Sequence, residues 1–292
     1  MTIVGFVGLG SMGSRMAGRL LDAGFEVHGT NRTAARAEPL LDRGLRWRDT
    51  PREVASTVDV VISMVTDDAG LRAIMDGPDG IVVGLSTDKV CIDMSSVSPQ
   101  ASTHVAQQVR KTGAWMVDAP VSGSVPQAEQ GTLTIMVGGD EATYQRVEPL
   151  LHRLGQSVVR VGDNGAGVVV KLAINISLAV QTLAFSEGLL IAERGGVDVR
   201  LAAQVMAGSA IGSPALKARV PFLLELPDSA WFTVALMHKD ICLARDEGQR
   251  MGITMPSASA AADALDMAEQ LGYAQRDLAS LHEVLAKISE DT

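Results

Sequence analysis

Gly8-Leu9-Gly10-Ser11-Met12-Gly13 decides the fold, because it joins an apolar run, Ile3–Leu9, to a segment with helical spacing, Met12–Ala23. In a strand–turn–helix unit the first glycine permits the tight turn, and the second lets a pyrophosphate approach the backbone. The third glycine lets the helix pack on the strand, and the helix N-terminus points its N–H groups at the phosphates. A purely structural turn is the alternative. The stretch predicts a dinucleotide site made by these six residues.

The second predicted strand, Glu26–Thr30, ends at Asn31-Arg32-Thr33. A site specific for NAD usually places Asp or Glu here to bind the ribose hydroxyls. Asn31 carries no charge that would repel a 2′-phosphate, and Arg32 can pair with one through its planar guanidinium. An arginine that only faces solvent is the alternative. The triplet Asn31, Arg32 and Thr33 therefore favours NADP(H), with NAD(H) as a weaker cofactor.

Two further strand ends are expected to border the cofactor, because the carboxyl ends of parallel strands line the cofactor crevice. The third strand ends at Val65 and Thr66, which we expect beside the adenosine or the nicotinamide ribose. The fourth ends at Ser95-Ser96, whose hydroxyls and backbone are expected near the nicotinamide half. We assign Val65, Thr66 and Ser96 to the cofactor site.

The first half of the chain alternates strand-like and helical segments, which predicts parallel strands with helices on both faces. After Gly162 the strand-like runs stop. Asp163-Asn164-Gly165 is a turn and N-cap signal before a helix over 166–194, which would run roughly 40 Å at about 1.5 Å per residue. The predicted fold class is α/β: a Rossmann-type dinucleotide-binding domain, 1–162, joined by a long interdomain helix to an all-α substrate and oligomerisation domain, 163–292.

Composition narrows the class of protein. The 292 residues are 47% hydrophobic and 20% charged, which is typical of a folded globular protein. The formal charge of −9 argues against a nucleic-acid binder. Cys91 and Cys242 lie far apart in apolar stretches, and no His, Cys or carboxylate cluster has metal-ligand spacing. We predict reduced thiols, no metal and no nucleic-acid partner.

The sequence predicts a cytoplasmic protein without a membrane partner. The N-terminal run Ile3–Leu9 lacks the basic region and the length of a signal peptide. The most apolar later stretch, 168–191, is interrupted by polar side chains, Lys171 and Asn175 among them. A bilayer-spanning helix would rarely carry so many polar groups.

Asp118-Ala119-Pro120-Val121-Ser122-Gly123-Ser124 is a strand that runs into a Gly/Ser turn. Such a turn can aim backbone N–H groups and a hydroxyl at an anion, which suits a substrate carboxylate. A tight loop without a ligand is the alternative. We assign Ser122, Gly123 and Ser124 to substrate binding.

Lys171 and Asn175 lie four residues apart and share one face of the predicted long helix. A dry setting lowers a lysine pKa, which suits proton exchange with a carbonyl or alcohol oxygen, and Asn175 would hold the same oxygen or the substrate carboxylate. A lysine that extends to solvent is the alternative. Farther on, Phe232 is a candidate for the substrate pocket wall. Lys239 either reaches the cofactor or forms a solvated ion pair with Asp240.

These motifs together resemble the β-hydroxyacid dehydrogenase family over essentially the whole chain. They are Gly8–Gly13, Asp118–Gly123 with Gly131-Thr132-Leu133, Gly165-x-Gly167-x-x-x-Lys171-x-x-x-Asn175, and Lys239-Asp240. The resemblance implies that Lys171 is the catalytic acid/base, that Ser122, Gly123 and Asn175 bind substrate, and that Ser96 and Lys239 lie at the cofactor. The family commonly has threonine where Ser96 stands. Many members have a second glycine where this chain has Ser124, which is expected to alter the pocket.

The resemblance implies an NADP-preferring oxidoreductase that interconverts a small β-hydroxy acid and its semialdehyde by hydride transfer, as a homodimer or homotetramer. Asn31-Arg32-Thr33, Phe185-Ser186-Glu187-Gly188 and His238-Lys239-Asp240 are most similar to the glyoxylate/succinic semialdehyde reductase branch. Substrates of the 3-hydroxyisobutyrate, 4-hydroxybutyrate and glyoxylate types all remain open. An imine reductase of related layout and a non-catalytic NADP(H)-binding protein are the alternatives.

Overall fold

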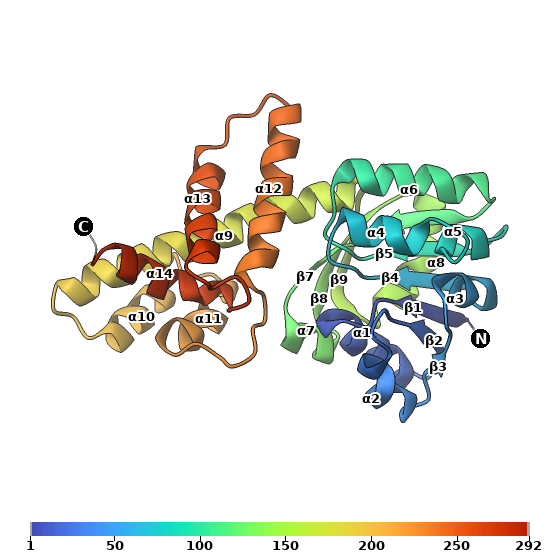
Figure 1. Cartoon of the computed structure of the whole chain (residues 1–292), viewed down its shortest axis with the longest axis horizontal. Helices are drawn as coiled ribbons and strands as arrows, with labels where there is room; N and C mark the ends of the chain where they lie inside the picture. The colour runs from blue at the N-terminus through green and yellow to red at the C-terminus, as the bar shows by residue number, and fades with distance from the viewer. Residues whose placement is uncertain (1, 291–292) are drawn as a thin grey trace. The chain divides into compact units, whose positions relative to one another are not determined.

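In a computed structural model that describes residues 2–290, the chain forms two compact units, Met1–Lys171 and Leu172–Thr292 (Figure 1). All the named strands in the described part of the chain belong to the first unit, and the second unit is helical. Helix α9 (Ala166–Arg194) spans the point of division. The α/β class with an N-terminal Rossmann-type domain and helical C-terminal part is confirmed, while the boundary between residues 162 and 163 stays a prediction.

A nine-stranded sheet forms the centre of the first unit, in the order β3-β2-β1-β4-β5-β6-β8-β7, with β9 paired to β8. The order runs outward from β1 in both directions, so a topological switch point lies between β1 and β4, where doubly wound sheets bind ligands. The strands are β1 (Ile3–Val7), β2 (Glu26–Thr30), β3 (Arg46–Trp47), β4 (Val60–Ser63), β5 (Val90–Asp93), β6 (Trp115–Asp118), β7 (Val121–Ser122), β8 (Leu133–Gly138) and β9 (Gly155–Gly162).

The expectation of an all-parallel sheet is wrong at one end. Strands β1 to β6 pair in parallel, but β8 runs antiparallel to both β6 and β7. Only residues 123–132 separate β7 from β8, fewer than the dozen or more that a parallel crossover needs. The chain therefore turns back on itself directly after the Ser122-Gly123 segment.

Helices cover the parallel part of the sheet, and their apolar faces complete one core. Phe6 of β1 and Ile62 of β4 are fully buried, together with Met16 and Leu20. Residues 34–41 form two short helices rather than one, because Pro39 lacks the N–H that a continuous helix would need there. The helices are α1 (Ser11–Asp22), η1 (Ala34–Ala37), α2 (Glu38–Leu41), α3 (Pro51–Thr57), α4 (Asp68–Met75), α5 (Ile81–Gly84), α6 (Pro99–Lys111), α7 (Val125–Gln130) and α8 (Glu141–Leu151).

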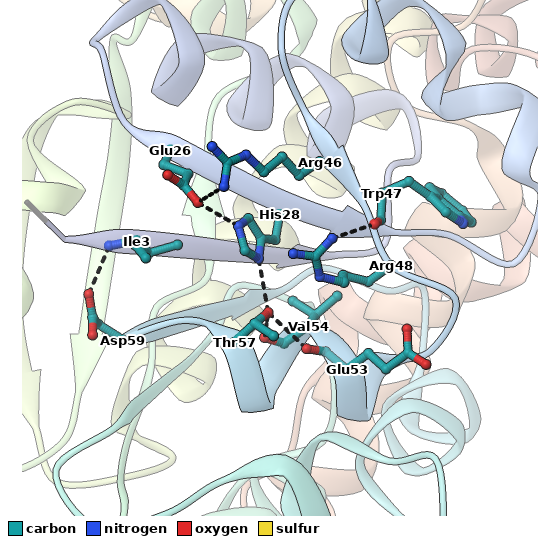
Figure 2. A network of polar contacts seen from close by, with 10 residues as sticks. All are labelled: Ile3, Glu26, His28, Arg46, Trp47, Arg48, Glu53, Val54, Thr57 and Asp59. Atoms are coloured by element: carbon teal, nitrogen blue, oxygen red, sulfur yellow. Dashed lines mark hydrogen bonds and ion pairs between the residues drawn. The ribbon is translucent and has the colours of Figure 1, made fainter.

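A buried histidine ties β2 to α3 (Figure 2). The Nε2 atom of His28 lies 2.8 Å from Glu26 Oε1, and its Nδ1 atom lies 2.9 Å from Thr57 Oγ1. Arg46 of β3 donates to the same Glu26 oxygen. The hydrogen bond from His28, followed by the charge of Arg46, holds the pKa of Glu26 below its usual value. This network fixes β2, the strand that Asn31 directly follows.

The second unit packs its helices around a core that is fully buried at Met237, Ile241 and Leu265. By length and composition α9 could cross a membrane, with a mean hydropathy of 1.8 in its apolar window, of which 39% is buried; core helices of soluble proteins pass the same test. The remaining helices are α10 (Val199–Gly208), α11 (Pro214–Leu224), α12 (Val234–Arg250), α13 (Pro256–Gln270), η2 (Leu278–Ser280) and α14 (Leu281–Ile288).

Candidate functional site

The glycine turn between β1 and α1 is closed by contacts that exclude a side chain. Gly8 has φ +99°, and a Cβ there would lie 2.2 Å from the carbonyl oxygen of Met64. A Cβ on Gly13 would lie 2.0 Å from the carbonyl oxygen of Gly8, because α1 packs directly on the turn. A Cβ on Gly10, by contrast, would meet nothing within 4 Å. Gly8 and Gly13 therefore build the turn, and Gly10 leaves open space above it.

Helix α1 begins at that open space without a cap from the chain. Its N-cap is Gly10, no side chain bonds to its first N–H groups, and its first turn holds no acidic residue. Unpaired N–H groups and the partial positive charge of a helix start attract anions. Together with the space at Gly10, this arrangement fits the pyrophosphate of a dinucleotide.

Asn31 connects the glycine turn to the end of β2. Its Oδ1 accepts a hydrogen bond from the Leu9 N–H at 2.9 Å, and its Nδ2 donates to the Thr33 carbonyl at 2.9 Å. The Asn31 amide is thereby fixed beside the turn, while the side chains of Arg32 and Thr33 are exposed. The structure brings this triplet to the edge of the predicted cofactor site.

The ends of β4 and β5 hold a buried polar cluster that the sequence analysis missed. Ser63 and Ser95 both donate to Oδ1 of Asp93, at 2.8 and 2.7 Å, and the Val65 N–H donates to Ser95 Oγ at 2.9 Å. Burial raises the pKa of Asp93, against the hydrogen bonds from the two serines. The cluster holds in place the segment that leads to Thr66 and the segment that leads to Ser96. Its sequence signal is two strands that end in Ser and Asp where apolar residues are expected.

The predicted carboxylate turn lies where β7 meets α7. Ser122 pairs with Thr134 of β8. Gly123 has φ +133°, and a Cβ there would lie 2.7 Å from Leu133, so the turn requires glycine at this position. Ser124 is the N-cap of α7, and its N–H donates to Gln127 Oε1 at 2.8 Å. The turn is thus a fixed structure.

Asp118 ends β6 and contacts the start of α9. It is fully buried, and its carboxylate oxygens accept hydrogen bonds from the Gly165 N–H at 2.6 Å and from the Val168 N–H at 3.1 Å. Burial raises the pKa of Asp118 to about 6, although these hydrogen bonds oppose the rise. Asp118 belongs to a motif that the sequence shows, but no role was predicted for it.

Lys171 and Asn175 lie on α9, one helical turn apart, as predicted. Lys171 is half-buried, and Asn175 is buried. In the second unit the Asn175 amide donates from Nδ2 to Asp240 Oδ2 at 2.5 Å, and Lys239 Nζ lies 2.7 Å from the other Asp240 oxygen. Because Asp240 is 1% exposed, the ion pair with Lys239 has a buried carboxylate rather than the solvated one that was the simpler expectation. The hydrogen bond from Asn175 to Asp240 was not predicted.

Phe232 lies in a loop held by a buried carboxylate. Oδ2 of Asp277 accepts from the N–H groups of Trp231 and Phe232, at 2.9 and 3.2 Å, and Arg219 Nε lies 3.5 Å from Oδ1. The Phe232 side chain is partly buried against the helical core. Asp277 and Arg219 carry no local sequence signal, because they lie far from Phe232 along the chain.

Among residues 2–290, no group of three or more His, Cys, Asp or Glu side chains is arranged to hold a metal ion. Cys91 is buried, and burial is the main cause that raises the pKa of its thiol. Its surroundings are those of a core residue.

Two family patterns match the chain in succession. Residues 3–162 match the NAD binding domain of 6-phosphogluconate dehydrogenase. Residues 165–285 match a family described as NAD-binding of NADP-dependent 3-hydroxyisobutyrate dehydrogenase.

Individual relatives are similar over nearly the full length of this chain. The chain is 34% identical over 282 residues to 2-hydroxy-3-oxopropionate reductase of Escherichia coli, covering 97% of this chain and 96% of the relative. It is 31% identical to the chloroplastic glyoxylate/succinic semialdehyde reductase 2 of Arabidopsis thaliana, covering 97% of this chain and 79% of the relative. The solved structure of Mycobacterium tuberculosis 3-hydroxyisobutyrate dehydrogenase with L-serine superposes with a TM-score of 0.86 at 30% identity, covering 98% and 99% of the two chains.

Proposed function

The chain belongs to the β-hydroxyacid dehydrogenase family of NAD(P)-dependent oxidoreductases, and we propose that it interconverts a small β-hydroxy acid and its semialdehyde with NADP(H) as preferred cofactor and Lys171 as acid/base. Substrates of the 3-hydroxyisobutyrate, succinic semialdehyde and glyoxylate types are all candidates. The family relatives with reductase names act on compounds of these kinds, as their names say.

The observation that carries the proposal is the attachment of α9 around Lys171. Asp118 bonds to the helix just before this lysine, and Asp240 bonds to Asn175 just after it. A lysine and an amide one turn apart, each with its surroundings fixed, suit proton exchange with a bound oxygen. A lysine that only covers the surface would need neither attachment.

In the reductive direction Lys171 would donate a proton to the carbonyl oxygen of the substrate as an alcohol forms. In the oxidative direction the neutral amine would take the proton of the alcohol. Asn175 has one Nδ2 hydrogen committed to Asp240, which leaves its second N–H and its Oδ1 for the substrate. The Ser122-Gly123 turn, with Ser124, would hold the substrate carboxylate, and Phe232 would form part of the pocket wall.

The cofactor would be held by the six residues of the glycine turn and by Asn31, Arg32 and Thr33, with Val65, Thr66, Ser96 and Lys239 nearby. A bound nicotinamide dinucleotide supplies the hydride. The exposed guanidinium of Arg32 supports the preference for NADP(H), because no acidic residue takes its place at the end of β2.

We also propose that the chain works as a homodimer or homotetramer in the cytoplasm. Large apolar side chains are exposed on the second unit, including Ile191 of α9 at 76% and Val205 of α10 at 64%. Exposed large apolar side chains on one unit support association with a further copy.

Imine reduction is the second candidate, and the residues argue against it. An iminium carbon needs neither a carboxylate clamp nor a lysine proton donor, whereas this chain has both the Ser122-Gly123 turn and Lys171. A non-catalytic NADP(H)-binding protein would have no use for a fixed Lys171–Asn175 pair.

The function is tested by following NADPH consumption with succinic semialdehyde, glyoxylate, methylmalonate semialdehyde, tartronate semialdehyde and a cyclic imine. We expect turnover with at least one acid and little with the imine. Lys171→Ala should lower kcat on the best acid by about 10²- to 10⁴-fold, the usual contribution of a general acid, while NADPH still binds. Faster turnover of the imine, or full activity of the variant, would refute the proposal.

A further inference from the structure

Asp118 joins the sheet to the helix that carries Lys171. One carboxylate oxygen accepts from the Gly165 N–H at 2.6 Å, and the other accepts from the Val168 N–H at 3.1 Å. Val168 lies three residues before Lys171, so the bonded backbone belongs to the same helical turn. All of these residues lie in the first unit.

The contact depends on backbone atoms that lie close together with no side chain between them. A Cβ on Gly167 would lie 2.8 Å from Asp118 Oδ2 and 2.5 Å from the carbonyl oxygen of Met136. A Cβ on Gly138 would lie 2.6 Å from both Asp118 oxygens. Such distances leave no room for a methyl group, so the first turn of α9 is seated directly against β6 and β8. A sideways or axial shift of the helix start would break a hydrogen bond or cause a clash.

The ionised Asp118 carboxylate costs folding stability at neutral pH. Burial, with a smaller contribution from the charge of Asp93 on β5, raises the pKa of Asp118 to about 6. A carboxyl whose pKa rises on folding adds stability at low pH and loses it as the pH rises through the folded-state value. Above about pH 6 the folded protein therefore holds a charge that burial disfavours. This points to a role in position rather than in stability.

We propose that Asp118 is a positioning residue for Lys171, whose ionised carboxylate fixes the place and direction of the first turn of α9. The inference rests on the proposed function of Lys171 as the acid/base. It also explains why the motif Asp118–Gly123 and the motif Gly165-x-Gly167-x-x-x-Lys171 occur together: the carboxylate of one fits against the glycine-flanked helix start of the other.

A pH dependence follows. A protonated carboxyl keeps one good acceptor oxygen, so it cannot serve both N–H groups equally well. Turnover should therefore fall as the pH drops through about 6. Asp93 is the charged group that faces Asp118 from β5, and the described contacts from β8 and α9 are backbone groups.

The central test is Asp118→Asn, which preserves size but replaces one acceptor oxygen with a donor. We expect kcat to fall by about 10²-fold, the effect of a small misplacement of a catalytic group, while KM and the Kd for NADPH change little. The low-pH loss of turnover should disappear in the variant. Independently of activity, amide hydrogen exchange at Gly165 and Val168 should become faster in the protein alone.

Two further variants separate positioning from general stability. Asp140 caps α8 through the Thr143 N–H at 3.0 Å, a matched carboxylate cap on a helix without the lysine. Asp140→Asn should lower Tm and leave kcat near that of the wild type. In a Lys171→Ala background Asp118→Asn should lower kcat little further, because a residue that acts through Lys171 has nothing left to position.

The proposal is overturned if Asp118→Asn keeps full kcat. It is also overturned if Asp118→Asn lowers kcat by the same factor in the Lys171→Ala background as in the wild type. These results would leave the proposed function intact, whereas the absence of wild-type turnover on every acid would refute the function itself. If Asp118→Asn does not fold, the wild type decides: as the pH drops through the interval near 6, turnover must fall, and the protection factor of the Val168 amide, which corrects for the intrinsic pH dependence of exchange, must fall with it. A protection factor that stays constant over this interval would refute the proposal.

Discussion

The starts of α1 and α9, both in the first unit, differ in what faces them. Helix α1 begins after Gly10 with no side chain bonded to its first N–H groups and no acid in its first turn. Helix α9 begins against the buried carboxylate of Asp118, which is bonded to Gly165 and Val168. The first helix start is open to an anion from outside, and the second is already bonded to an anion supplied by the chain.

This difference separates a binding element from a positioning element. An uncapped start beside the open space at Gly10 can accept a phosphate group. A start occupied by an internal carboxylate cannot serve a ligand in the same way, but it fixes the helix that carries Lys171. We propose that the same elementary property of helices, orphan N–H groups at the N-terminus, serves two purposes in one unit.

The largest expected effect tests the open helix start. Gly10→Ala adds a methyl group that meets no protein atom within 4 Å, so Tm should stay close to the wild-type value. The same methyl would fill the approach of the pyrophosphate to the backbone. NADPH should bind about 10²-fold more weakly by titration calorimetry, which corresponds to the loss of one or two hydrogen bonds to a charged group.

The matched control is Gly13→Ala, whose Cβ would lie 2.0 Å from the Gly8 carbonyl oxygen. In this variant both the Tm and the affinity for the cofactor should fall. Unchanged NADPH affinity in Gly10→Ala would break the comparison, because α1 would then not be the helix that receives the phosphates.

A smaller effect is expected at the edge of the same site. Arg32→Ala should weaken the binding of NADPH by about 1–2 kcal/mol, roughly 5- to 30-fold in Kd, because a charge-assisted contact with the 2′-phosphate is lost. NADH, which lacks that phosphate, serves as the internal control and should bind as before. Equal losses for both cofactors would remove Arg32 from phosphate recognition.

Most of the fold could be predicted from local patterns. The glycine turn, the parallel strands and the bounds of α9 follow from apolar periodicity and turn residues, which act over a few positions. The reversal of β8 could not be seen in that way. Its direction depends on the length of the connection after Ser122 and on pairing with β6, and neither changes the apolar pattern of β8 itself.

In the candidate site, too, local constraints could be predicted and contacts between residues distant in the sequence could not. Gly8, Gly13 and Gly123 were predicted because their constraint is local, and the structure shows the close contacts that require glycine. The hydrogen bonds of Asp118 and Asp240 were missed because their partners lie 47 to 65 residues away. A buried aspartate looks like any other acid in a sequence until its partner is placed beside it.

The most direct test of the central claim is the fate of labelled hydrogen. With NADPH deuterated at the transferable position of the nicotinamide, the wild-type protein should place deuterium on the carbon of the semialdehyde that becomes the alcohol, as read by NMR of the product. Lys171→Ala should form this labelled product far more slowly. An alcohol product without deuterium at that carbon, or no product from any of the acids, would contradict the account.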